Sequence, residues 1–191
     1  MSTLVLIRHG ETEMAGRFCG HSDPELNPAG EFQAARAAEQ AALLGVRRIC
    51  SSDLRRAAQT AGFLTRRIGV PVELRPDLRE MNFGLWEGLG WRQIEALFPE
   101  EADRWLREFP LCSAPRGEAY AAFTARVETA IESLLRTPFA GAIAIVTHRG
   151  VMLHTLVRYL GFSNEEAWSR TGSYGAVVAA AAPSFGVEAL I

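Results

Sequence analysis

The chain has 191 residues, of which 48% are hydrophobic and 22% charged, and its formal net charge at pH 7 is -2. This composition predicts a soluble globular domain with a sizeable core and excludes a disordered or fibrous protein. With 20 basic against 22 acidic residues, no overall positive field is available for a polyanion, so we expect no nucleic-acid partner.

Strands alternate with helices in the first half of the chain. The β-branched and leucine-rich run 3–7 indicates a buried strand that ends at Arg8 and His9. Asn27 and Pro28 offer an N-cap and a first-turn proline for the alanine-rich helix that follows. In chain order the predicted elements are a strand over 3–7, a helix from 28 to about 45, a strand over 46–50, a helix over about 53–68 and a strand over 72–74.

The second half begins with aromatic residues at helical spacing, and we interpret residues from about 81 to 116 as an inserted helical cap. The elements predicted after it are a long helix over 117–136, a strand over 142–146, a helix over 150–160 and strands over 175–181 and 187–190. The expected fold class is α/β, with a mainly parallel sheet that carries helices on both faces. We expect a single domain over 1–191, with the small helical subdomain inserted over the C-terminal edge of the sheet.

Two histidines stand directly after apolar runs, His9 after residues 4–7 and His148 after residues 143–146. Parallel strands end at the same edge of a sheet, which is where open α/β sheets bind ligands. Taken alone, either histidine is explained equally well as a site residue and as a polar residue that simply ends a strand. Because Arg8 adjoins the first and Arg149 the second, we expect the two to share a site for an anion.

The sequences around these histidines, and two stretches between them, form a specific pattern. The stretches are Arg8-His9-Gly10-Glu11-Thr12, Ser51-Ser52-Asp53-Leu54-Arg55-Arg56-Ala57-Ala58-Gln59-Thr60-Ala61, Leu78-Arg79-Glu80-Met81-Asn82-Phe83-Gly84-Leu85-Trp86-Glu87-Gly88 and Val146-Thr147-His148-Arg149-Gly150-Val151. In order and approximate spacing they resemble the signature blocks of the histidine phosphatase superfamily, also called phosphoglycerate mutase-like. The resemblance covers nearly the whole chain.

The resemblance implies a phosphoryl-transfer enzyme in which His9 takes up the phosphoryl group, Arg56 binds the phosphate and Glu80 is the acid–base residue. Physical chemistry agrees, because cleaving a phosphomonoester without a metal needs a nucleophile, cations around the phosphoryl oxygens and an acid for the leaving oxygen. Arg8 and a protonated or hydrogen-bonding His148 would complete the cationic part. The expected catalytic residues are His9, Glu80, Arg8, Arg56 and His148.

Four further residues are expected to bind substrate. Cys19 and Gly20 resemble the family's loop after the nucleophile, where the backbone approaches the substrate and glycine permits that closeness. Thr12 ends the first block, and Arg149 replaces the usual glycine after the second histidine, where it would narrow the pocket or add a cation. Ala15 stands near the place of a usual asparagine, so one phosphate hydrogen bond is missing or supplied otherwise.

Glu11 and the pair Arg55 and Arg56 each allow two interpretations. Glu11 is either a second acid or, as we favour, a salt-bridge partner of a pocket arginine. Arg55 and Arg56 both lie at the start of a helix, so one of them is expected in an ordinary ion pair at the surface, and only the family pattern selects Arg56.

The expected reaction is hydrolysis. No segment follows the last predicted strand to close over the pocket, and the cap lacks the extended basic block of the glycolytic mutases, whereas a mutase must exclude water. The alternatives are a cofactor-dependent phosphoglycerate mutase and an inactive member that only binds a phospho-ligand or a partner. Size and the compact first loop resemble α-ribazole phosphatases and broad-specificity phosphatases, so the expected substrate is a small phosphorylated metabolite such as α-ribazole phosphate.

The aromatic residues of the cap allow two interpretations. They are Trp86, Trp91, Phe98, Trp105 and Phe109. They either form an apolar pocket for a bulky leaving group or hold the cap helices onto the sheet, and their helical spacing favours the second.

Cysteine usage and apolar runs bear on location and partners. Cys19, Cys50 and Cys112 are widely spaced and odd in number, which argues against a disulfide framework or a zinc knuckle and favours a reducing, cytoplasmic setting. The apolar runs are too short to span a membrane, and we see no signal-peptide leader. We expect no cofactor, no metal and no membrane partner; a homodimer stays open.

Overall fold

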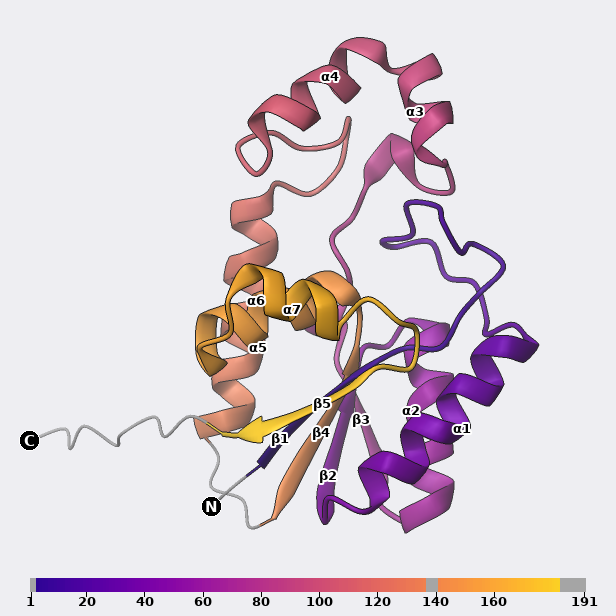
Figure 1. Ribbon diagram of the computed structural model, residues 1–191, viewed down its shortest axis with the longest axis vertical. Coiled ribbons are helices and arrows are strands. Elements are labelled where there is room, and N and C mark those ends of the chain that lie inside the picture. The colour runs from indigo at the N-terminus through magenta and orange to yellow at the C-terminus, as the bar shows by residue number, and fades with distance from the viewer. Residues whose placement is uncertain (1–2, 137–140, 183–191) are drawn as a thin grey trace, which may run out of the picture.

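The computed structural model describes residues 3–136 and 141–182 (Figure 1). The strand predicted over 187–190 lies outside these residues. The elements are β1 (Thr3–Arg8), α1 (Pro28–Ala42), β2 (Val46–Ser51), α2 (Arg55–Ile68), β3 (Val72–Leu74), the 3-10 turns η1 (Pro76–Leu78) and η2 (Gly84–Trp86), α3 (Trp91–Leu97), α4 (Pro99–Glu108), α5 (Tyr120–Arg136), β4 (Ala142–Thr147), α6 (Arg149–Leu160), α7 (Asn164–Arg170) and β5 (Val177–Ala181).

The described strands form one five-stranded sheet in the order β3-β2-β4-β1-β5. All neighbours pair in parallel except β1 and β5, which are antiparallel. Strands β1 and β4 lie side by side, and their register pairs Arg8 with Thr147 at the last residue of each strand. The predicted α/β fold with a mainly parallel sheet is confirmed.

Side chains of the central strands alternate between two apolar layers. Leu4 and Leu6 of β1 join a cluster with α5, α6 and α7, whereas Val5 and Ile7 join one with α1 and α2. Strand β4 repeats this alternation, and all six of its residues are buried. Figure 1 shows α1 and α2 on one side of the sheet and α5, α6 and α7 on the other. The hydrophobic effect thus fixes which helix covers which face.

Local sequence signals set most helix ends. Asn27 accepts a hydrogen bond from the Gly30 N–H (2.8 Å) at the start of α1, while Gly69 and Gly161 end α2 and α6 with a positive φ of 73°. Helix α1 ends at residue 42 and not near 45, and α5 begins at residue 120 and not 117.

Helix α7 is absent from the sequence prediction although its start carries a signal. The Ser163 hydroxyl accepts from the Glu166 N–H (3.2 Å), and the Glu166 carboxylate accepts from the Ser163 N–H (2.9 Å). This capping box marks a helix N-terminus, but only seven residues follow it. A helix this short has no clear apolar period, so the sequence pattern does not reveal it.

Helices α3 and α4 lie beyond one end of the sheet in Figure 1 and have a small core of their own. Its buried members are Trp86, Ile94, Ala102 and Ala114. Trp91 and Phe98 pack against them. For these aromatic residues the structure therefore supports the packing interpretation.

Candidate active site

The two histidines meet where β1 and β4 end. The His9 N–H donates to the Thr147 carbonyl at 3.0 Å, which continues the ladder one step past the paired ends of the strands. The centroids of the His9 and His148 rings are 5.1 Å apart. The structure thus brings together the two residues that the strand pattern places at one edge.

A tight backbone turn orients the His9 ring. Its Nδ1 lies 2.7 Å from the Gly10 carbonyl, and the Gly10 N–H donates to the Thr60 hydroxyl at 3.1 Å. A Cβ at residue 10 would lie 2.3 Å from the Gly30 carbonyl, so this turn requires glycine. Because Nδ1–H is the donor to Gly10, Nε2 keeps its lone pair and is the candidate nucleophile.

Both imidazoles are neutral at pH 7. Burial, together with the positive charges of Arg56 and Arg8, holds the pKa of His9 well below its usual 6.5. Burial and the charge of Arg56 likewise hold the pKa of His148 well below 6.5. Nε2 of His148 shares a hydrogen bond with the Ser52 hydroxyl at 2.9 Å, which fits the hydrogen-bonding form expected for this residue.

Arg56 is fully buried in the first turn of α2. Its guanidinium donates to three carbonyl oxygens, those of Ser22 (2.6 Å), Gly20 (2.8 Å) and Cys19 (3.2 Å). Arg55, its neighbour, is exposed and pairs with Glu25. The predicted surface ion pair of one of the two arginines is thus found at Arg55, and Arg56 is the buried one.

Glu87 organises the loop that holds Arg56, although the sequence analysis gives it no role. Its carboxylate accepts from the backbone N–H groups of Gly20, His21, Ser22 and Phe83 at 2.8 to 3.2 Å. Burial alone would raise the pKa of Glu87, but the hydrogen bonds from Ser22, Phe83 and His21 outweigh it and lower the pKa below 4.5. An acidic residue that binds several backbone donors cannot be found from spacing.

Replacing Glu87 with glutamine should lower the free energy of unfolding near neutral pH by about 2 kcal/mol, because charge-assisted hydrogen bonds to backbone donors are lost. This figure already includes a reduction for the partial exposure of Glu87 to solvent. Since the pKa is lowered in the folded state, this contribution is present above about pH 4.5 and is lost as pH falls through the folded pKa. Urea unfolding from pH 7 to pH 3 checks this. If the difference in free energy of unfolding between wild type and variant does not narrow toward pH 3, the proposed role of the carboxylate is contradicted.

Glu80 lies over the N-terminus of helix α6. It is 9% exposed; its Oε1 accepts from the Met81 N–H at 3.0 Å and its Oε2 from the Gly150 N–H at 2.9 Å. A Cβ at residue 150 would lie 2.3 Å from Oε1, so glycine there makes room for the carboxyl group. The expected acid–base residue is therefore close to the second histidine block.

A cavity of about 330 Å³ opens beside His9. Of the predicted site residues it is lined by Arg8, His9, Thr12, Cys19, Glu80 and Arg149. Its other lining residues, which were not predicted, are Met14, Gly16, Arg17, Phe18, Phe83, Trp168 and Tyr174. Trp168 and Tyr174 come from α7 and the turn before β5, a region where the sequence indicates no element.

Three predicted site residues do not line this cavity. Arg56 and His148 are buried behind it, where Arg56 acts on His9 through its charge. Gly20 also packs closely, because a Cβ there would lie 2.0 Å from the Met81 carbonyl. Its expected contact with substrate stays a prediction.

Two arginines of the cavity stack on aromatic rings, one from α7 and one from the turn before β5. Arg8 stacks 4.0 Å above the Tyr174 ring and Arg149 stacks 3.6 Å above the Trp168 ring. The Nε atoms of Arg8, Arg149 and Arg56 are buried and have no hydrogen-bond partner among the described residues. Each such donor costs about 1–3 kcal/mol, and a bound oxyanion would offset that cost.

The ion pair favoured for Glu11 is not found among the described residues, while Ala15 agrees with its expectation. Glu11 accepts from the Asn27 side chain at 3.0 Å and forms no ion pair with a pocket arginine in the described part of the chain. Ala15 is exposed and does not line the cavity. Arg17 does, and it brings a further cation close to where the asparagine would stand.

A second cavity, of about 590 Å³, adjoins the first and shares Phe18, Glu80, Phe83, Arg149 and Trp168 with it. Its other lining residues are Met81, Trp105, Phe109, Tyr120, Phe123, Gly150, Leu153, His154, Val157 and Asn164. Trp105 and Phe109 of the predicted aromatic set thus face an apolar space beside Glu80. Trp105 also packs against the cores beside α5 and beneath the cap, so for these two residues both interpretations stay open.

The described residues contain no group of three or more histidine, cysteine or acidic side chains placed to hold a metal ion. Cys19, Cys50 and Cys112 are free thiols. Within residues 3–136 and 141–182, no helix has the length and apolar character needed to cross a membrane.

The fold and the site define a class of phosphoryl-transfer protein, in which a neutral histidine stands among arginines at the carboxyl edge of a parallel sheet. The sequence profile of the histidine phosphatase superfamily (branch 1) matches residues 4–182. The chain belongs to that superfamily.

Known proteins show what the chain is similar to. It is 36% identical over 163 residues to the probable phosphoglycerate mutase GpmB of Escherichia fergusonii, covering 82% of this chain and 74% of that protein. It is 31% identical over 167 residues to the adenosylcobalamin/alpha-ribazole phosphatase of Escherichia coli, covering 86% and 82%. The structure of the alpha-ribazole phosphatase from Shigella flexneri matches with a TM-score of 0.83 and 31% identity, covering 93% of this chain and 89% of that one.

Proposed function

We propose that this protein hydrolyses phosphomonoesters through a phosphohistidine formed on Nε2 of His9. The observation that carries this is the His9 ring itself: its Nδ1 is bound to a carbonyl, its pKa is far below neutrality, and it lines a cavity with three arginines and Glu80. A neutral imidazole in such a cationic pocket is a competent nucleophile for a phosphate ester.

The reaction takes place in two steps, phosphorylation and then dephosphorylation of His9. In the first, Nε2 attacks phosphorus, the bond to the ester oxygen breaks, and protonated Glu80 gives its proton to the departing alcohol. In the second, Glu80 takes a proton from water, whose oxygen attacks phosphorus while the bond to Nε2 breaks. Arg8, Arg17 and Arg149 would balance the phosphoryl charge, and Arg56 would favour the neutral form of His9.

The adjoining apolar cavity supports a leaving group with an apolar body as well as the phosphate. Its volume of about 590 Å³ lies in the range of small-molecule sites, and Glu80 stands where the two cavities join. We propose a small phosphorylated metabolite of this kind as substrate. α-Ribazole phosphate fits the description, and the names of the phosphatase relatives support it.

The test is a panel of esters assayed for released phosphate in EDTA: p-nitrophenyl phosphate, α-ribazole phosphate, 3-phosphoglycerate and a hexose phosphate. We expect turnover that EDTA does not remove and that vanadate, which adopts the geometry of the transition state, inhibits. Isomerisation of 3-phosphoglycerate, primed with the bisphosphate, at a rate above phosphate release would establish the mutase alternative. Absence of turnover from pH 4 to 8 would establish a binding protein, and activity restored only by added metal would refute the metal-free mechanism.

A further inference from the structure

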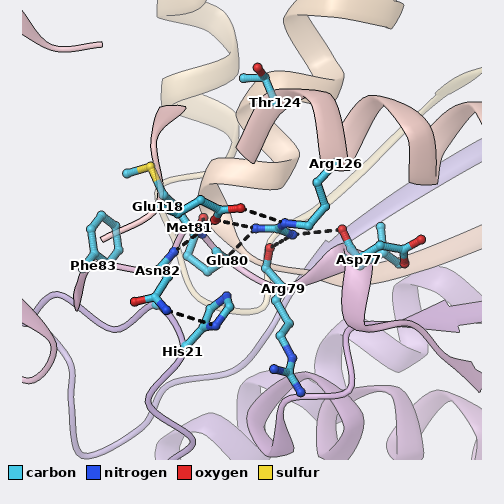
Figure 2. A network of polar contacts seen from close by, with 12 residues as sticks. His21, Asp77, Arg79, Glu80, Met81, Asn82, Phe83, Glu118, Thr124 and Arg126 are labelled. Carbon is cyan, nitrogen blue, oxygen red and sulfur yellow. Dashed lines mark hydrogen bonds and ion pairs between the residues drawn. The ribbon is translucent and has the colours of Figure 1, made fainter. Parts of the chain in front are cut away.

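Arg126, on helix α5, hydrogen-bonds to the backbone that carries Glu80. Nη1 of Arg126 donates to the carbonyls of Asp77 (3.0 Å) and Arg79 (2.9 Å), and Nη2 donates to the carbonyl of Glu80 itself (3.3 Å) (Figure 2). Nε and Nη2 also bind the Glu118 carboxylate at 3.0 and 2.8 Å. All three nitrogens of the guanidinium are therefore engaged.

Glu118, the ion-pair partner of Arg126, fixes the chain directly after Glu80. The Glu118 N–H donates to the Asn82 carbonyl (2.8 Å), and its carboxylate accepts from the Asn82 N–H (3.3 Å), as Figure 2 shows. From the sheet, the Thr147 hydroxyl donates to the Leu78 carbonyl at 2.8 Å. The backbone from residue 77 to 82 thus has little freedom.

Arg126 lines neither cavity, so it acts on a substrate only through other residues, and one of its hydrogen bonds reaches the backbone of Glu80. Its side chain is 23% exposed and that of Glu118 is 17% exposed. A mostly buried guanidinium with this fork of donors holds several oxygens in fixed geometry, which a lysine or a neutral side chain does less well.

We propose that Arg126 is a positioning residue for the acid–base step: it sets the backbone of residues 77–80 so that the Glu80 carboxyl group faces the junction of the two cavities, where the leaving oxygen departs. This rests on the role proposed for Glu80. Misplacing an acid by about 1 Å can lower the rate on the order of 100-fold. The loss should fall mainly on substrates that need the acid, because none of the hydrogen bonds of Arg126 reaches His9 or the arginines of the cavity.

The test compares Arg126→Gln with wild type on an alkyl phosphate and on p-nitrophenyl phosphate, whose phenolate leaves without a proton. We expect kcat for the alkyl ester to fall about tenfold or more, with KM little changed, while the burst phase on the aryl ester stays within about threefold. Combined with Glu80→Gln, Arg126→Gln should add no further loss on the alkyl ester, because both changes remove the same function.

Arg75→Gln is the matched control. Arg75 binds Asp77 (2.6 Å) and Glu73 (3.2 Å) through carboxylates and Ser133 of α5 at 3.1 Å, but none of its hydrogen bonds reaches the carbonyls that Arg126 binds. This variant should lose stability and keep the wild-type ratio of alkyl to aryl rates. If Arg126→Gln does not fold, Arg126→Lys, which keeps the charge but not the fork, carries the same comparison.

Two results would overturn the inference and tell it apart from the proposed function. Equal losses on both esters, or losses that add to those of Glu80→Gln, would make Arg126 merely structural while Glu80 keeps its role. If Glu80→Gln itself shows no dependence on the leaving group, the acid–base assignment fails and the positioning role fails with it.

Discussion

Replacing His9 with alanine is expected to lower turnover by at least about three orders of magnitude, as loss of a covalent nucleophile does. The neighbouring His148 is even more buried and its ring lies 5.1 Å away, but its Nε2 is already bound to Ser52. His148→Ala should therefore slow the reaction but still form a phosphoenzyme, whereas His9→Ala should form none.

The measurement is acid- and base-quenched trapping of the phosphoryl group from a labelled aryl phosphate, together with kcat. Thermal unfolding of both variants controls for loss of fold. An acid-labile, base-stable phosphoenzyme in His9→Ala would exclude His9 as the nucleophile, and one that disappears in His148→Ala but persists in His9→Ala would assign the role to His148.

Replacing Glu80 with glutamine should lower the rate on an alkyl phosphate by about 100-fold or more, because a poor leaving group requires a proton from a positioned acid. The aryl ester should lose little in its burst phase. Because the same carboxylate must later take a proton from water, we expect a burst of p-nitrophenolate followed by slow turnover. Rapid-quench kinetics on both esters resolves the phases.

Equal loss on the two esters during the burst, with His9 still phosphorylated, would place the acid elsewhere. Glu11 was the alternative by sequence, but it binds Asn27 and does not line the cavity. Asn27→Ala, which frees Glu11 without touching Glu80, provides the matched control and should leave the ratio of the two rates unchanged.

The reactive edge of the sheet could be predicted because it depends on local pattern. Short apolar runs followed closely by a histidine mark strand ends, and strands that alternate with helices indicate a parallel sheet. Arg56 could be selected only with the family pattern, because the sequence alone does not show which of the adjacent residues Arg55 and Arg56 is buried. The meeting of the two histidines is confirmed, because strand direction can be predicted without tertiary detail, whereas phosphate binding by Arg56 stays a prediction.

The walls and supports of the site could not be predicted because they depend on packing between distant loops. Glu87 binds a loop more than sixty residues earlier in the chain, and Tyr174 reaches Arg8 from the far end of the sequence. Arg56 and His148 were expected at the pocket surface but lie behind it, since burial depends on how the loop at Cys19 closes. Spacing carries no signal for such contacts.

The pairing of β1 with β4 also bears on how the protein folds. These neighbours in the sheet are separated by most of the described sequence, so their contact closes a very long loop and is among the entropically expensive steps of folding. Until it forms, His9 has neither its hydrogen bond to Thr147 nor its neighbour His148. A partly folded chain can hold α1 packed against α2 and still lack an organised nucleophile, so we expect catalysis only after the central strands have paired.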